Sequence, residues 1–112
     1  MTVQAQIQDF AHQVAERYSP QEIILFGSHA RGEAQNASDV DLLVILDHEI
    51  DNVEKAIEIR NLLHPRFALD LLVRRPDDIA RRIAMNDYFI QEIVEEGVVL
   101  YDGSRSRNSN GK

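Results

Sequence analysis

The sequence of 112 residues contains no cysteine and no tryptophan, and it has no long hydrophobic run. The absence of cysteine excludes disulfides, thiolate metal sites and cysteine nucleophiles. No apolar stretch approaches the roughly 20 residues that span a bilayer, and the first ten residues, MTVQAQIQDF, do not resemble a signal peptide. We therefore expect a cytoplasmic protein that has no membrane partner.

Positive charge is also scarce in this sequence. Its 12 Lys and Arg residues stand against 19 Asp and Glu residues, which gives a formal net charge of −7. A general nucleic-acid binder neutralises phosphates with a basic face, so this balance argues against direct DNA binding. Hydrophobic residues make up 44% of the chain, which suits one ordinary globular domain.

Helical and strand patterns alternate along the chain. Apolar residues spaced by three and four predict helices over residues 3–18 and 50–63, and a proline in a first turn predicts another from Pro76 to Gly97, with a break near Asn86-Asp87. Residues 29–35 suit a short helix. Runs rich in Ile, Leu and Val predict strands over residues 22–26, 40–46, 67–73 and 98–102.

This alternation predicts an α/β (α+β) domain over residues 1–102, with a small mixed β-sheet of about four strands flanked by helices. Residues 103–112, GSRSRNSNGK, contain no apolar side chain, and we expect them to form a disordered tail.

Three aspartates interrupt strands that are otherwise apolar. Successive strand residues face opposite ways, so Asp39 and Asp41 project to the same side, with Cα atoms about 6.5–7 Å apart. Asp70 lies between two leucines of the next predicted strand, where an unpaired acid is costly to bury. If the two strands are neighbours, the three carboxylates form one cluster.

Such a cluster favours a metal site. Each acid taken alone also suits a turn or a cap, but acids are rarely buried without a partner, and three together are harder to explain that way. Neighbouring carboxylates raise one another's pKa unless cations balance them, and neither strand contains Lys or Arg. Oxygen ligands favour Mg²⁺ or Mn²⁺ over zinc. We therefore predict a metal site formed by Asp39, Asp41 and Asp70.

Gly27 and Ser28 directly follow the first predicted strand. A glycine there lets the backbone approach a ligand, the N–H groups at a helix start favour phosphate, and the serine hydroxyl adds a donor. Arg31, one helical turn further, is within reach of a phosphate or a carboxylate. An ordinary turn is the alternative interpretation, because the segment GSHARG is neither a Walker-type phosphate loop nor a dinucleotide-binding fingerprint. A phosphate site beside a pair of metal ions is typical of phosphoryl or nucleotidyl transfer.

Together, residues 27–46, GSHARGEAQNASDVDLLVIL, resemble the motif of the DNA polymerase β-like nucleotidyltransferase superfamily. The shared pattern is Gly-Ser, then Ala-Arg-Gly, then Ser-Asp-x-Asp-Leu, followed by an acid in a later strand, here Asp70. The short length and the segment EEGVVLYDG are similar to the minimal nucleotidyltransferase (MNT) family. Relatives in that family commonly act as antitoxins beside a HEPN-domain ribonuclease toxin.

The resemblance implies a role for each matching residue. Gly27 and Ser28 would hold the triphosphate of the substrate ATP, and Asp39 and Asp41 would bind two Mg²⁺ ions, with Mn²⁺ as a substitute. Asp70 would bind one metal ion and help to deprotonate the acceptor hydroxyl. The resemblance further implies AMP transfer (AMPylation) from ATP to a tyrosine of a partner HEPN toxin, which this chain would silence as its antitoxin.

Several interpretations stay open at this point. Arg31 would brace the loop or contact phosphate. An antitoxin that masks its toxin by steric binding alone is one alternative, and nucleotidyl transfer to a small molecule is another. The pairs Arg74-Arg75 and Arg81-Arg82 suit either a solvated helix face or a patch that contacts an acidic partner or nucleotide phosphates.

Overall fold

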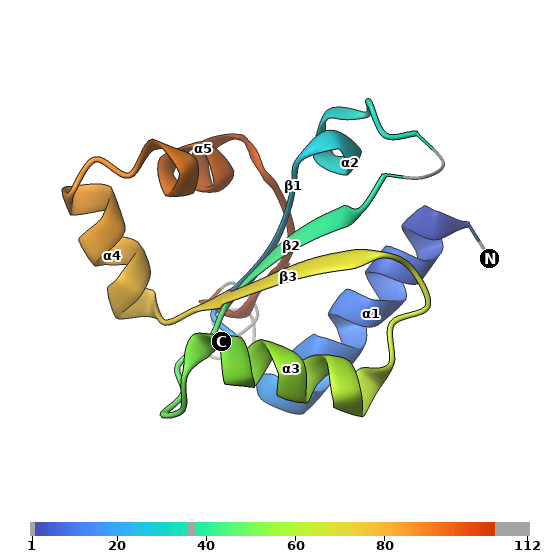
Figure 1. Cartoon of the computed structure of the whole chain (residues 1–112), viewed down its shortest axis with the longest axis horizontal. Helices are drawn as coiled ribbons and strands as arrows, with labels where there is room; N and C mark the ends of the chain where they lie inside the picture. The colour runs from blue at the N-terminus through green and yellow to red at the C-terminus, as the bar shows by residue number, and fades with distance from the viewer. Residues whose placement is uncertain (1, 36–37, 105–112) are drawn as a thin grey trace, which may run out of the picture.

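A computed structural model of the chain describes residues 2–35 and 38–104. One sheet lies between two helical layers, with α1 and α3 on one face and α4 and α5 on the other (Figure 1). The helices are α1 (Val3–Tyr18), α2 (Ser28–Arg31), α3 (Asn52–Leu63), α4 (Pro76–Ala84) and α5 (Tyr88–Glu96). The strands, in their order across the sheet, are β3 (Leu69–Arg74), β2 (Val40–Ile45), β1 (Glu22–Phe26) and β4 (Val98–Asp102).

The sheet is mixed, as predicted. Strand β1 is antiparallel to both of its neighbours, β2 and β4, whereas β2 and β3 are parallel. A parallel pair needs a crossover connection, and α3 supplies it. In this pairing Asp41 of β2 lies opposite Asp70 of β3. The expectation that these two strands are neighbours is confirmed.

Strand β2 is buried on both faces, which explains its continuous apolar run. Val40, Leu42 and Val44 pack in the core formed with α1 and α3. Leu43 and Ile45 pack on the opposite face in a smaller cluster with residues of α5. The alternation predicted from the sequence is therefore correct, and the two aspartates at the start of the strand belong to the α5 face.

Several element boundaries differ from the prediction. Strand β3 begins at Leu69 instead of residue 67, because the chain bends at residues 66–67 before it enters the sheet. The Phe67 ring packs edge-to-face on Phe10 of α1, with centroids 5.8 Å apart. Helix α2 ends at Arg31 instead of residue 35, because Gly32 takes a left-handed conformation that stops it. Helix α3 begins at Asn52, where the Asp51 side chain caps it.

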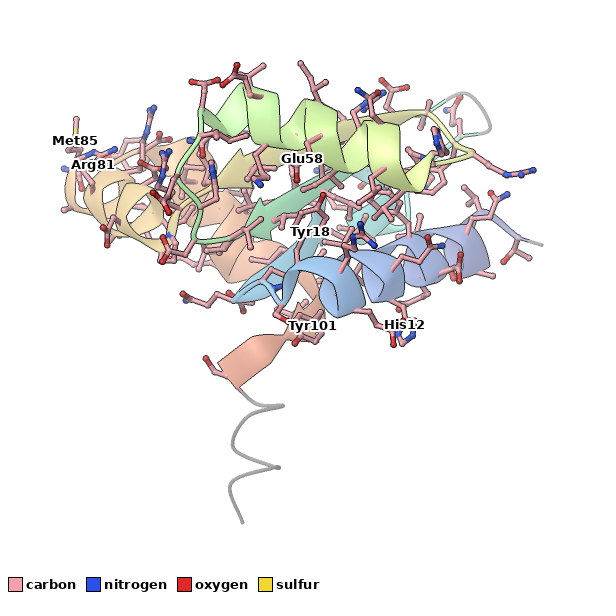
Figure 2. The ribbon with its side chains drawn as sticks, turned by 90° about the horizontal axis from the view of Figure 1, so that it is seen from below. His12, Tyr18, Glu58, Arg81, Met85 and Tyr101 are labelled. Atoms are coloured by element: carbon pink, nitrogen blue, oxygen red, sulfur yellow. The ribbon has the colours of Figure 1, made fainter. Side chains whose placement is uncertain are left out.

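Helices α1 and α3 are joined by polar contacts as well as by the core. The Tyr18 hydroxyl donates a hydrogen bond to Glu58 Oε2 at 2.9 Å, and the two side chains meet between the helices (Figure 2). Burial and this hydrogen bond raise the pKa of Tyr18 to about 12. The Lys55 ammonium lies 5.5 Å from the centre of the Tyr18 ring. This layer covers the sheet face that does not carry Asp41.

The C-terminal end of the described chain returns to the sheet. Gly103 is buried, and its N–H donates to the Gln21 carbonyl at 2.9 Å. Residues 105–112, the rest of the predicted tail, lie outside the described residues. Within the two described ranges, no helix is both long and apolar enough to cross a membrane.

Candidate active site

A pocket of about 360 Å³ opens at the end of the sheet where β1 ends and where β2 and β3 begin. Residues of β1 and the turn after it, of α2, of the beginnings of β2 and β3, and of α5 line this pocket. The lining residues are Phe26, Gly27, Ala30, Arg31, Asp41, Asp70, Phe89, Glu92, Ile93, Glu96 and Gly97. The pocket therefore contains four of the six residues predicted from the sequence motif.

Asp41 and Asp70 face this pocket from neighbouring strands. They are paired in the parallel register, so their backbones lie about 4.8 Å apart, the usual spacing between strands. Burial raises the pKa of the Asp41 carboxyl above its ordinary value, and repulsion from Asp70 and then Asp39 raises it further. Asp70 and Asp39 are therefore both within electrostatic reach of Asp41.

The side chains do not converge on one point, however. Asp39 is exposed and is not among the residues that line the pocket. Over residues 2–35 and 38–104, no three His, Asp or Glu side chains are placed so that they could hold one metal ion. The donor chemistry still fits a hard cation, because Asp41 and Asp70 offer only oxygen atoms and share one pocket.

Gly27 holds the turn after β1 against Asp41. Its backbone has φ 75° and ψ −156°, a conformation that is essentially restricted to glycine. A Cβ atom at this position would overlap Asp41 Oδ2. The Gly27 carbonyl accepts hydrogen bonds from the N–H groups of Ala30 and Arg31 at 3.1 and 3.2 Å. Ser28 begins α2 and is half-buried, but it does not line the pocket.

Arg31 lines the same pocket but is engaged elsewhere. Its Nε lies 2.9 Å from Glu33 Oε1, and both side chains are exposed. The hydrogen bond to Glu33 and the charge of Glu33 raise the pKa of the guanidinium, and Glu92 and Asp41 add smaller contributions. Arg31 is therefore close to the acids without being paired with them.

Sequence reasoning missed the wall formed by α5. Phe89, Glu92, Ile93 and Glu96 line the pocket at spacings of three, one and three along one helix flank. That spacing was visible in the sequence and predicts a shared face. The sequence motif ends well before α5, so neither the two apolar residues nor the two glutamates of this flank were predicted as site residues.

The arginine pairs, by contrast, are structural in part. Arg81 is bonded to Asp78 at 2.7 Å, Arg82 lies 3.3 Å from Asp87, and the Arg75 side chain donates to the His48 carbonyl at 2.9 Å. These contacts lie around α4, away from the residues that line the pocket. The interpretation as a solvated helix face fits Arg81 and Arg82, whose side chains are mostly exposed, whereas Arg75 precedes α4 and bonds the loop before α3.

Comparison with known proteins assigns the family. A family model described as the nucleotidyltransferase domain matches residues 7–100. The chain belongs to this family. It is 31% identical over 103 residues to "Putative protein adenylyltransferase MJ0604" of Methanocaldococcus jannaschii, which covers 90% of this chain and 100% of that protein. It is 41% identical over 64 residues to "Protein adenylyltransferase MntA" of Thermococcus cleftensis, which covers 55% of this chain and 64% of that protein.

The fold is shared with a solved nucleotide-bound complex. A chain from the "Crystal structure of the toxin-antitoxin with AMP-PNP" superposes with a TM-score of 0.56 at 22% identity, over 85% of this chain and 73% of that one. The predicted nucleotidyltransferase fold and the resemblance to the MNT family are confirmed. The chain is accordingly a nucleotidyltransferase.

Proposed function

We propose that this nucleotidyltransferase transfers AMP from ATP to a hydroxyl group of a partner protein, and that the partner is a toxin which the transfer silences. The observation that carries the proposal is the pocket in which Asp41 and Asp70 lie in register beside the Gly27 turn. Two relatives are named as protein adenylyltransferases, and the structural neighbour is a toxin–antitoxin complex with an ATP analogue. A HEPN-domain ribonuclease is the toxin we propose, with a tyrosine as acceptor.

The acids would act together in the transfer. Asp39 and Asp41 would hold two Mg²⁺ ions, and Asp70 would hold one of them. When bound, the ions supply positive charge that stabilises both the attacking and the leaving oxygen of the displacement. Gly27 and Ser28 would hold the triphosphate, and Asp70 would also receive the proton of the acceptor hydroxyl.

The proposed transfer is a displacement at the α-phosphorus of ATP. The acceptor oxygen forms a bond to the α-phosphorus of ATP while the bond from that phosphorus to the bridging oxygen breaks. Pyrophosphate leaves with the bonding electrons, and the hydroxyl proton passes to the Asp70 carboxylate. The protein forms no covalent bond to the substrate in this step. Most of the rate acceleration would come from holding the acceptor oxygen and the leaving pyrophosphate in line with the α-phosphorus.

The charge of the pocket supports a requirement for divalent cations. Four of the residues that line the pocket are acidic, and the basic one, Arg31, is paired with Glu33. A triphosphate carries several negative charges, so it would be repelled from this lining unless cations accompanied it. We therefore propose Mg²⁺ as the cofactor and a metal–ATP complex as the substrate.

Incubation with ATP and Mg²⁺, with and without the product of the adjacent gene, tests the proposal. Intact-mass measurement should show a gain of one or more AMP units on the partner, and chelation of the metal should prevent it. The double variant Asp39→Asn/Asp41→Asn should remain folded and should transfer nothing. Retained transfer by the double variant would overturn the assignment of these acids. A tight complex with no mass gain on either protein would instead favour neutralisation by steric binding.

A further inference from the structure

The α5 wall of the pocket carries an aromatic ring whose position is fixed on one side. Phe89 is 53% exposed, which is high for a residue of this type next to a core cluster. Its ring packs edge-to-face against Phe26, with centroids 5.8 Å apart and planes at 84°. Phe26 is half-buried, packs against the α5 cluster and directly precedes Gly27. The ring is therefore held in place from the side of the Gly27 turn.

The Phe89 ring keeps one face free to contact a ligand. An edge-to-face contact with Phe26 covers at most one face of the Phe89 ring, and about half of the residue remains open. Apolar or small residues, Ala30, Ile93 and Gly97, continue the wall around it. A flat apolar surface suits a flat aromatic ligand, and nucleobases stack well on aromatic side chains.

The pocket has residues of two kinds in its lining. Asp41, Asp70, Arg31, Glu92 and Glu96 are charged, whereas Phe26 and Phe89 supply aromatic rings. A nucleoside triphosphate likewise combines two kinds of group, a charged tail and an aromatic base. A volume of about 360 Å³ lies within the usual range for small-molecule sites.

We propose that Phe89 is the platform on which the base of the nucleoside triphosphate stacks. The inference rests on the proposed function, because that function assigns the pocket to the nucleotide. It makes Phe89 a residue that binds the substrate by its aromatic face. Binding energy from the base would therefore be lost when the ring is removed, while binding of the triphosphate would be kept.

Equilibrium binding without the partner protein separates these two contributions. ATP and ribose 5-triphosphate, a ligand with no base, are titrated with Mg²⁺ into the wild type and into Phe89→Leu and Phe89→Tyr. We expect the wild type to bind ATP about tenfold more tightly than ribose 5-triphosphate. Phe89→Leu should lose that preference, and Phe89→Tyr, which keeps the ring, should retain it. Tyr88→Leu is the matched control, because Tyr88 precedes Phe89, is 75% exposed and does not line the pocket.

A fluorescence measurement gives a second and independent readout. The chain contains no tryptophan, so Phe89→Trp introduces a single indole that can be excited selectively. ATP should quench this fluorescence by stacking on it, whereas ribose 5-triphosphate should not. Tyr88→Trp places the same indole one residue away, outside the pocket, and should respond to neither ligand.

The outcomes distinguish this inference from the proposed function. If Phe89→Leu keeps the preference for ATP, or loses affinity for both ligands equally, the stacking role is overturned while the pocket remains a nucleotide site. The absence of ATP-specific quenching in Phe89→Trp would overturn it as well, even if Phe89→Leu failed to fold. If the wild type binds neither ligand in the presence of Mg²⁺, the proposed function itself fails.

Discussion

Two aspartates near opposite ends of the sheet have opposite electrostatic surroundings. Asp78 of α4 is 9% exposed, and its carboxylate accepts hydrogen bonds from the Arg75 backbone N–H at 2.9 Å, from Asn52 at 3.1 Å and from Arg81 at 2.7 Å. These donors, the Arg75 N–H first, lower the pKa of Asp78 to about 2. Asp41 instead has a raised pKa, because burial and neighbouring acids disfavour its charged form.

The difference separates a residue that stabilises the fold from one that does not. The native structure favours ionised Asp78 and disfavours ionised Asp41, so only Asp78 contributes stability at neutral pH. A carboxyl group whose ionised form the fold disfavours does not stabilise the protein, so a role in function explains its presence. Such residues concentrate at functional sites. The two ends of the sheet can therefore be told apart by applying the same substitution to each.

The largest expected effect is on transfer, at the pocket. Asp41→Asn removes a proposed metal ligand, and a bound ion supplies several kcal/mol of transition-state stabilisation, so the rate of AMP transfer should fall roughly 1,000-fold. The free energy of unfolding in the absence of Mg²⁺ should stay within about 0.5 kcal/mol of the wild type or rise, because repulsion is relieved. Transfer assays and thermal melts on the same preparation measure both quantities.

The wild type and the variant should also differ in their response to Mg²⁺. Ligands that bind only the native state raise its stability by mass action, so Mg²⁺ with ATP should raise the melting temperature of the wild type. The variant Asp41→Asn should show a much smaller rise. An equal rise in both proteins would contradict the placement of the metal ions at Asp41.

A pair of glycines isolates the contact between the Gly27 turn and Asp41. Gly27 and Gly32 both have positive φ, 75° and 74°, so alanine strains the backbone at either position. Only at Gly27 would the added Cβ overlap Asp41 Oδ2, whereas at Gly32 it would meet nothing within 4 Å. Gly32→Ala should lose about 1 kcal/mol of stability, and Gly27→Ala should lose more, because its ψ of −156° places it in a region that alanine rarely adopts and its Cβ would meet Asp41.

Transfer should distinguish the two glycine variants. Gly27→Ala displaces the Asp41 carboxylate, and displacements of about 1 Å at a reacting centre cost on the order of 100-fold in rate. Gly32→Ala should keep most of its activity when it is assayed well below its melting temperature. Equal losses in the two variants would show that backbone strain, and not the contact with Asp41, explains the requirement for glycine.

At the other end of the sheet the same Asp→Asn change should act on stability. Asp78→Asn weakens a set of charge-assisted hydrogen bonds and leaves buried donors poorly satisfied, which should cost about 2 kcal/mol. For a domain of this size the melting temperature should fall by roughly 10 °C. Transfer at low temperature should remain within about twofold of the wild type, since Asp78 does not line the pocket.

The pH dependence of stability should identify the same residue. Because the pKa of Asp78 in the folded state, about 2, is below the ordinary value of 3.8, its contribution is fully present above pH 4. That contribution is lost as the pH falls from about 4 to about 2. Denaturant titrations at several pH values should show the difference between wild type and Asp78→Asn shrinking across this window. A difference that stayed constant would assign the lost stability to packing instead of charge.

The contrast between the two ends also explains what the sequence could predict. Asp41 and Asp70 stand out because period-two alternation makes a charged residue conspicuous in a strand that is apolar on both faces. Their adjacency required only that two consecutive strands be neighbours. The place of Asp78 in the first turn of a helix could be predicted from the proline before it, and two of its donors lie only three residues away. The bond from Asn52 could not, because Asn52 is 26 residues from Asp78 and no local pattern connects them.

The α5 wall escaped prediction for a related reason. The buried residues of α5, Ile90 and Ile93, define the face that packs on the sheet. Whether the adjoining flank, with Phe89, meets solvent or a pocket depends on the angle at which the helix packs on the sheet. That angle is set by side-chain packing between α5 and the sheet, a tertiary property that helical periodicity does not specify. The orientations of the Asp39, Asp41 and Asp70 side chains also depend on tertiary contacts. The motif predicted only the positions of these residues along the backbone.

The smallest effect should come from the two glutamates on that flank. Glu92 and Glu96 add negative charge to the pocket without being among the proposed metal ligands. Replacing both with glutamine removes part of the repulsion that a triphosphate meets, so ATP with Mg²⁺ should bind about two- to threefold more tightly at low ionic strength. The gain should shrink as salt is added, because exposed charges are screened. Glu95→Gln removes one negative charge from the same helix outside the pocket, and should change affinity less than either single variant, Glu92→Gln or Glu96→Gln. Weaker binding in the double variant would mean that these carboxylates hold the nucleotide or its cation, and would extend the catalytic acids from the strands to α5.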